Sequence, residues 1–395
     1  MGNIIDYVRE YGVITFGERP FTVVDCLVLC QLSYLKFDGI VPGTQIRLPA
    51  MSLSQIKEHK KAEHLFADEK YEKVNRALFE AVCGSKRFGT MKLNYHINIV
   101  DVEKETQFSA TTFFLRDENF VAYRGTDETF IGWKEDFNMA FLSPVPGQTL
   151  AVNYLNKVAR LTEGKLVVCG HSKGGNLAVY ASMKCDEATR IRIEDIYSMD
   201  GPGFPQRVLD NSNYDEIKEK IHKVIPHSSL VGMLLQSQED YCVVESSNFG
   251  LLQHDPYSWM IKDNKFVSSK DIYISSMFMD EVINGWIASL SEEQLHIFTE
   301  TLFGVIDATQ ASTRIELASE WKKSAIAFMN AAKEIDDDTK KMMKEIIKKL
   351  FHMLRDKKIQ KQLRLNIHTA LHEDSLFTTV VGNSSGKDRI SADER

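Results

Sequence analysis

Residues 170–174, with the sequence Gly-His-Ser-Lys-Gly, are the group in this chain whose types and spacing best fit a reaction. A serine hydroxyl becomes a nucleophile when a sharp turn between a strand and a helix presents it to a base at the helix N-terminus. The apolar run 165–169 predicts a short buried strand, and the small residues of 175–182 predict a closely packed helix. The pattern therefore predicts a nucleophile elbow with Ser172 at its tip, and an ordinary glycine turn is the alternative.

Histidines beyond the elbow are candidates for the base, because α/β-hydrolases supply serine, acid and histidine in that chain order. His254 follows the predicted strand 241–245 and stands in a loop that we expect to open into a helix. The last strand of such a sheet delivers its histidine at this place, so we predict His254 as the base. His227, just beyond the predicted strand 221–225, is the alternative base, and a polar helix cap is the alternative role for His254.

The acid that orients the histidine has one main candidate. Asp200 ends the predicted strand 195–199 and precedes a Gly-Pro-Gly turn, which places its side chain at the edge of the sheet beside the elbow. The commoner acid position follows the next strand, at 226–229, where no carboxylate stands. We therefore predict Asp200, with Asp240 as its main rival and Asp255 as a weaker one. An Asx turn that caps Gly201 is the alternative role for Asp200.

An oxyanion hole combines the N–H after the nucleophile with an N–H from the loop after an earlier strand. The first is that of Lys173. The segment 120–127 reads as a strand followed by glycine and a hydroxyl residue, so we predict that Thr126 supplies the second. A plain turn with a helix N-cap is the alternative for this loop.

The motifs resemble a known family. The order and spacing of 123–126, Trp133, Asp136, 170–175 and 201–203 are similar to those of the class 3 lipases. Closer still, the segments 200–204 and 225–234 resemble the bacterial Mbeg1-like proteins, an α/β-hydrolase family long described as a domain of unknown function. The resemblance runs from about Thr22 to Trp259. It implies an α/β-hydrolase fold, Ser172 as nucleophile and Thr126 at the oxyanion position.

One departure from the family pattern concerns the acid. Class 3 lipases carry it in the segment that here reads Ser-Ser-Leu-Val, at 228–231. Either Asp200 has taken over the role from the preceding strand, or the triad is degenerate.

The resemblance also implies a lid, because class 3 lipases cover their acyl groove with a helix after the oxyanion loop. The corresponding segment here is 128–145, with the apolar residues Phe130, Ile131, Trp133, Phe137, Met139, Phe141 and Leu142. A helix that is apolar on most faces is either buried or covers an apolar surface. Ordinary core packing is therefore the alternative to a lid.

The whole chain has the pattern of an α/β protein with a helical extension. Mainly helical signals before residue 90, including the stretch 54–82, are followed by strands that alternate with helices, which implies a mostly parallel sheet flanked by helices. Four amphipathic helices are predicted beyond residue 269, at 277–290, 291–308, 314–333 and 339–365. We predict a hydrolase domain at 1–268, a helical region at 269–381 and a disordered tail at 382–395.

The last predicted helix, 339–365, has apolar residues at helical spacing and many more basic than acidic residues. Such a helix lies on an anionic membrane surface or packs its apolar face into a bundle, and both interpretations stay open. The formal net charge of −7 argues against a nucleic-acid partner.

The six cysteines show no C-x-x-C pair or metal-ligand spacing, so we expect reduced core thiols and neither a metal nor an organic cofactor. The N-terminus lacks a basic region followed by an apolar run, and no stretch reaches the roughly 18 apolar residues that span a bilayer. We therefore expect a cytoplasmic protein.

These features together predict a serine hydrolase that cleaves a carboxylic ester of a lipid or another small acyl compound. A thioesterase or acyltransferase would use the same triad, and a non-catalytic hydrolase-fold protein that binds a partner is the alternative from a different class.

Overall fold

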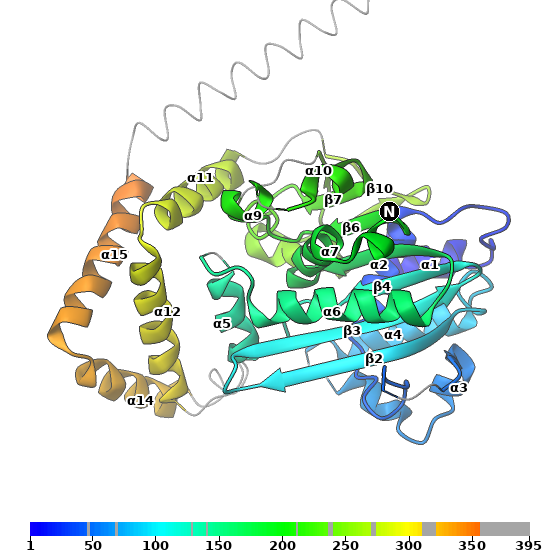
Figure 1. The fold of residues 1–395 in the computed structure, drawn as a ribbon, viewed down its shortest axis with the longest axis horizontal. Helices are drawn as coiled ribbons and strands as arrows, with labels where there is room; N and C mark the ends of the chain where they lie inside the picture. Colours follow the sequence, from blue (N-terminus) through cyan, green and yellow to red (C-terminus); the bar gives the residue numbers. More distant parts are fainter. Residues whose placement is uncertain are drawn as a thin grey trace, which may run out of the picture.

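A computed structural model of the 395-residue chain describes residues 1–45, 48–67, 70–127, 129–139, 141–210, 212–235, 240–269, 274–309 and 321–355. Its centre is an eight-stranded mixed sheet whose spatial order follows the chain, from β1 to β8 (Figure 1). The strands are β1 Met51–Ser52, β2 Lys92–Asp101, β3 Thr106–Leu115, β4 Glu118–Tyr123, β5 Lys165–His171, β6 Ile193–Met199, β7 Ile221–Pro226 and β8 Tyr241–Val244. Pairing is antiparallel from β1 to β4 and parallel from β4 to β8, so the predicted α/β-hydrolase architecture is confirmed.

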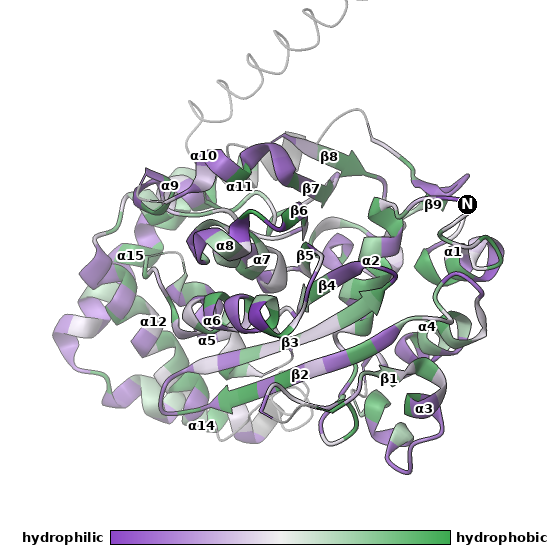
Figure 2. Ribbon diagram, turned by 45° about the vertical axis from the view of Figure 1, so that its right-hand side comes forward, coloured by the Kyte–Doolittle hydropathy of each residue, from purple (hydrophilic) through white to green (hydrophobic). Residues whose placement is uncertain are grey.

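Helices cover both faces of the sheet. Alternation along β4 sends Phe120 and Ala122 into a core with the N-terminal helices, whereas Val121 and Tyr123 enter the core on the opposite face. The first core is built on α1 Ile4–Tyr11, α2 Val23–Leu32 and α4 Glu72–Gly84. The second is built on α6 Pro146–Leu161 and α7 Lys173–Lys184. Hydrophobic residues run along the whole of α2, which is buried (Figure 2).

The parallel register brings the ends of three strands together. His171 at the end of β5 pairs with Met199 of β6, and Met199 pairs with Val224 of β7. The residues that follow these strands therefore emerge side by side at one edge of the sheet, where ligands bind in open α/β sheets.

The C-terminal helices pack mainly on one another, and one of them, Glu292–Asp307, contacts the helix Phe130–Asn138 that follows β4 (Figure 1). They are α11 Ile274–Ala288, α12 Glu292–Asp307, α14 Trp321–Glu334 and α15 Asp337–Arg355. Ile346 of α15 is fully buried in a cluster that includes Phe141 and Trp286, and Trp286 Nε1 donates to the Ile346 carbonyl at 3.0 Å. The part of α15 that the structure describes thus packs an apolar face into a bundle. None of the described helices is long and apolar enough to cross a membrane.

Three predictions for the C-terminal region extend past the described residues. They are the helix start at 314–320, the helix end at 356–365 and the tail at 382–395.

The structure gives the detail of two local predictions. The helical stretch 54–82 consists of α3 Leu53–Lys57, a 3-10 helix Ala62–Phe66 and α4, with the polar residues 58–61 between the first two. The helix expected after His254 is a single short 3-10 turn, Pro256–Ser258, and a hairpin of β9 Ile261–Lys262 with β10 Lys265–Phe266 follows it.

A buried ion pair fastens the N-terminal helices together. Arg87, after α4, donates to both carboxylate oxygens of Asp25 at 2.7 and 2.6 Å, and neither side chain is exposed. Arg87 also donates to the carbonyls of Ile14, Arg19 and Pro20. The Arg87 guanidinium thereby joins the loop before α2, α2 itself and the end of α4.

Arg87→Leu should lower the free energy of unfolding by about 3–5 kcal/mol, because it leaves the Asp25 carboxylate buried without its counter-ion. Urea unfolding measures the change. Arg9→Ala is the matched control, since the Arg9–Asp6 pair spans 4.0 Å with side chains 61% and 56% exposed and should contribute less than about 1 kcal/mol. Equal small losses in both variants would contradict this role of Arg87.

Candidate active site

Ser172 lies at a strained turn between β5 and α7. Its backbone dihedrals are φ 60° and ψ −131°, a conformation that residues other than glycine rarely adopt and that recurs at functional sites. A Cβ at Gly170 would stand 2.1 Å from the Gly174 carbonyl oxygen, so the close approach of strand and helix requires glycine there. The turn thus joins a strand to a helix tightly at Ser172, as the sequence predicted for an elbow.

Ser172, His254 and Asp200 form one hydrogen-bonded chain. Ser172 Oγ lies 2.8 Å from His254 Nε2, and His254 Nδ1 lies 2.6 Å from Asp200 Oδ2. Since a carboxylate accepts, Nδ1 carries the hydrogen and Nε2 is left to accept from the serine hydroxyl. The structure thus brings together the three residues that the sequence predicted as a triad.

Asp200 is fully buried, and its second oxygen is also satisfied. Oδ1 accepts from Ser229 Oγ at 2.5 Å and from the Gly232 N–H at 3.1 Å. Ser229 belongs to the segment in which class 3 lipases carry their acid. In this chain that segment has no carboxylate, and its Ser229 instead donates a hydrogen bond to the carboxylate of Asp200. The φ of Asp200, 50°, is a second strained backbone position in the site.

The rival residues have other partners. His227 is buried, and its Nε2 accepts from Gln253 Nε2 at 2.8 Å. Asp240 is exposed at the start of β8. Asp255 caps the turn after His254 by accepting from the Tyr257 N–H at 3.1 Å. His254 and Asp200, and not these residues, face Ser172.

The loop that carries His254 is anchored by the residue before it. Gln253 is fully buried, accepts from the Ser228 N–H at 2.8 Å and donates to the Asn248 carbonyl at 2.9 Å. Trp259 Nε1 donates to the Gln253 carbonyl at 2.8 Å. These bonds fix the backbone beside His254, a support that sequence reasoning did not predict.

His171 supports His254 from the other side. Its Nε2 donates to the His254 carbonyl at 2.9 Å, and its Nδ1 accepts from the Tyr34 hydroxyl at 3.0 Å. Burial, and then the nearby charge of His254, hold the pKa of His171 well below its usual range, so this imidazole stays neutral. Tyr34 follows α2, which means that the N-terminal helical layer reaches the elbow.

The predicted oxyanion loop lies against the elbow. A Cβ at Gly125 would stand 2.6 Å from the His171 carbonyl and 3.0 Å from Ser172 Cβ, so only glycine allows this approach. Within the part of the chain that the structure describes, neither the Thr126 N–H nor the Lys173 N–H donates a hydrogen bond to the protein. Two unengaged donors beside a serine are the arrangement that an oxyanion hole requires.

The side chain of Lys173 pairs with the helix after the oxyanion loop, α5 Phe130–Asn138. Its Nζ donates to Glu135 Oε2 at 2.7 Å, and both side chains are 1% exposed. Glu135 also accepts from the Gln107 and Gly147 N–H groups, at 3.1 and 2.7 Å. The pair fastens α5 to the elbow, and neither sequence position suggested it.

The next residue along α5, Asp136, lies in the same network. Asp136 Oδ2 accepts from Thr126 Oγ1 at 2.6 Å, whereas Oδ1 is buried with no hydrogen-bond partner among the described residues and lies 3.8 Å from Lys173 Nζ. Burial raises the pKa of Asp136 from 3.8 to about 6, and the Lys173 charge and the Thr126 hydrogen bond oppose that rise. Asp136 thereby holds the side chain of Thr126, the residue predicted for the oxyanion hole.

The described residues of the segment 128–145, which are 129–139 and 141–145, are fixed at several points. Glu135 is tied to the elbow, Phe137 stacks edge to face on Phe303 of α12 at 5.7 Å, and Lys134 Nζ lies 2.9 Å from Glu300 of α12. Phe141 is buried among the C-terminal helices. The described residues of this segment therefore show the packed alternative to a lid.

Three thiols gather behind the elbow. The Sγ atoms of Cys26, Cys30 and Cys169 lie within 4.8 Å of one another, and all three residues are fully buried. Burial raises the pKa of the Cys26 and Cys30 thiols, whereas hydrogen bonds from these two thiols lower the pKa of Cys169 to about 5. The cluster fits core packing, and the sequence could not show it because Cys169 lies far along the chain.

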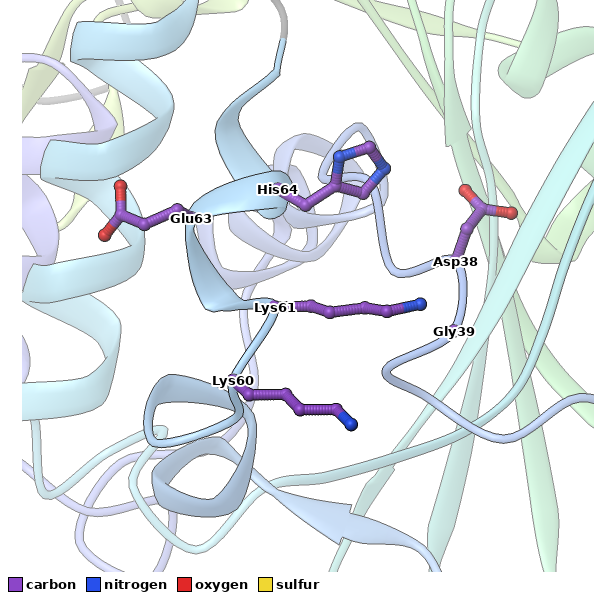
Figure 3. A pocket seen from close by; sticks show the side chains of 6 residues that line it. All are labelled: Asp38, Gly39, Lys60, Lys61, Glu63 and His64. Carbon is purple, nitrogen blue, oxygen red and sulfur yellow. The ribbon is translucent and has the colours of Figure 1, made fainter.

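A surface pocket of about 610 Å³ lies elsewhere (Figure 3). It is lined by Asp38, Gly39, Lys60, Lys61, Glu63 and His64. None of these residues belongs to the triad or to its supports, so the pocket adds nothing to the chemistry of Ser172.

A comparison with known families identifies the family of this chain. The family model described as Mbeg1-like matches residues 82–304, which is more than half of the chain and includes every residue of the triad. The chain belongs to the Mbeg1-like family. No curated protein matches it.

Three of the solved structures to which this chain is similar are lipases, each 12% identical to it. An M37 lipase is similar over 66% of this chain and 79% of its own, with a TM-score of 0.34. The Rhizomucor miehei lipase propeptide complex covers 42% of this chain and 58% of its own, with a TM-score of 0.31. The Lip2 lipase from Yarrowia lipolytica covers 47% and 73%, with a TM-score of 0.28. This Mbeg1-like chain thus spans less than two thirds of the Rhizomucor enzyme.

Asp136→Asn should change how stability depends on pH. Because the pKa is raised in the folded state, the carboxyl stabilises the fold below about pH 4, and this contribution is lost as pH rises through about 6. The asparagine variant should therefore gain stability relative to the parent between about pH 4 and pH 7. Urea unfolding of both proteins across this window measures the difference, and a difference that is constant with pH would contradict the raised pKa.

Proposed function

We propose that this Mbeg1-like protein is a serine hydrolase that cleaves a carboxylic ester, with a lipid or another acyl ester as substrate. The observation that carries the proposal is the chain from Ser172 Oγ to His254 Nε2 at 2.8 Å and from His254 Nδ1 to Asp200 Oδ2 at 2.6 Å. Serine, imidazole and carboxylate in this order and at these distances are the machinery of acyl transfer.

The reaction would run in two halves. Ser172 Oγ attacks the ester carbonyl while His254 Nε2 takes the hydroxyl proton, and His254 then gives that proton to the departing alcohol as the C–O bond breaks. A water molecule next attacks the acyl-enzyme, with His254 again accepting and returning a proton. The acid leaves, and Ser172 is restored.

Two neighbours would stabilise the charges that form. The Asp200 carboxylate, buried and held on its other oxygen by Ser229, keeps the imidazole in the required tautomer and offsets the imidazolium charge. The unengaged N–H groups of Lys173 and Thr126 would donate to the tetrahedral oxyanion. No residue in this scheme requires a cofactor.

Ser172→Ala should abolish ester hydrolysis and labelling by a fluorophosphonate probe, because it removes the only atom that the scheme uses as nucleophile. Asp200→Asn should lower kcat by about three to four orders of magnitude, because an amide favours the wrong imidazole tautomer. Hydrolysis of p-nitrophenyl esters of increasing chain length measures both effects and ranks the acyl groups.

Asp240→Asn is the matched control, since Asp240 is an exposed carboxylate and should be dispensable. Thermal unfolding of each variant separates loss of chemistry from loss of fold. Full activity of Ser172→Ala, or a crippled Asp240→Asn beside an active Asp200→Asn, would show that the site is wrongly assigned.

A further inference from the structure

Three large apolar side chains project into solvent from residues 249–252, the tip of the loop before His254. Phe249 is 84% exposed, Leu251 is 65% exposed and Leu252 is 70% exposed. Gly250 between them has a φ of 54°, a turn conformation that favours glycine. Single exposed apolar residues are ordinary, but three together with no charged residue among them form a patch that calls for a partner.

This tip is held firmly at its base. Asn248 Nδ2 donates to the Leu252 carbonyl at 3.0 Å, and the Asn248 N–H donates to Ser246 Oγ at 3.1 Å. Gln253, the residue after the tip, is fully buried and hydrogen-bonded to the Ser228 N–H. Because both ends of 249–252 are fixed, the apolar side chains are presented outward by the fold itself.

The tip lies two residues before the partly exposed His254. The ring of His254 is 28% exposed and hydrogen-bonded to Ser172. A surface that received the tip would therefore meet the protein next to the serine.

We propose that residues 249–252 insert into the apolar layer of a lipid surface and hold the site of Ser172 against it. The proposed insertion into lipid depends only on the exposed tip, whereas its effect on catalysis rests on the proposed hydrolase activity. The substrate would then be an acyl ester that resides in a bilayer or droplet and enters the site from there.

The shape and chemistry of the tip favour lipid over a protein partner. A stable protein interface draws on roughly 20–30 residues a side, with a polar rim around an apolar centre. Four residues without charge suit insertion below a headgroup layer, where only apolar side chains are needed. Binding should therefore depend little on salt, unlike binding by a basic helix, whose charges are screened.

The binding test uses Ser172→Ala protein, so that substrate turnover plays no part. Flotation with neutral phosphatidylcholine vesicles compares this protein with a tip variant that adds Phe249→Ser, Leu251→Ser and Leu252→Ser. The tip variant should lose about a hundredfold or more in vesicle partitioning, because it removes all three apolar side chains from the membrane phase. Added salt should leave the partitioning of the parent nearly unchanged.

A matched control removes equally exposed apolar side chains from other loops. Val102 and Ile191 are 71% and 72% exposed, so Val102→Ser with Ile191→Ser should bind vesicles like the parent. If the parent fails to bind vesicles, or if the tip variant binds as well as the parent, the proposal is overturned. It is also overturned if size-exclusion chromatography shows a dimer that the tip variant dissolves, since the tip would then cover a second copy.

Activity separates this proposal from the proposed function. In protein that retains Ser172, the tip variant should lose at least tenfold more activity on a long-chain ester held in vesicles than on a soluble acetate ester. Equal losses on the two substrates would contradict delivery from a surface. If the protein binds vesicles through the tip but hydrolyses neither ester, the proposed hydrolase activity is refuted. The proposed insertion into lipid is then still supported.

Discussion

A buried carboxylate at the end of β6 is the constraint on which the site depends. Removing an unpaired charge from water costs many kilocalories per mole, so Asp200 can be ionised in the core only if the protein satisfies its oxygens. His254 Nδ1 occupies one oxygen, and Ser229 with the Gly232 N–H occupies the other. The loop after β7 therefore has to pass Asp200, and the loop after β8 has to bring a histidine to it.

The rest of the fold secures these loops. The N-terminal helices reach the elbow through Tyr34 and His171, which hold the backbone of His254, and the Asp25–Arg87 pair fixes those helices to one another. On the opposite side, Lys173 and Glu135 join the elbow to α5, and α12 packs on α5 in turn. If the protein has the proposed activity, a change far from Ser172 that displaces the histidine by less than an ångström should slow the reaction.

The site contains two strained backbone positions and borders one exposed apolar segment. Ser172 and Asp200 both have positive φ, and such backbone persists only where surrounding contacts determine it. At the apolar tip 249–252, a base fixed by hydrogen bonds holds three apolar side chains in water, which is unfavourable in free energy. The tip is one apolar part of the described site that is exposed to solvent.

The sequence alone determined the elbow, the alternating strands and the family, because each depends on neighbouring residues or on fixed spacing. The fold class and the Mbeg1-like resemblance were confirmed, and the choice of Asp200 followed from the missing carboxylate at 226–229. The roles of the triad and of the oxyanion residues stay predictions, although the structure brings those residues together.

Only the tertiary structure decided which distant residues meet. It paired Lys173 with Glu135, set His171 between Tyr34 and His254, gathered Cys169 with two cysteines of α2, and limited the helix expected after His254 to a short turn followed by a hairpin. Sequence periodicity reports which face of an element is buried but not which partner covers it. The partner follows from how the two helical layers and the sheet pack, and that packing is a property of the whole chain.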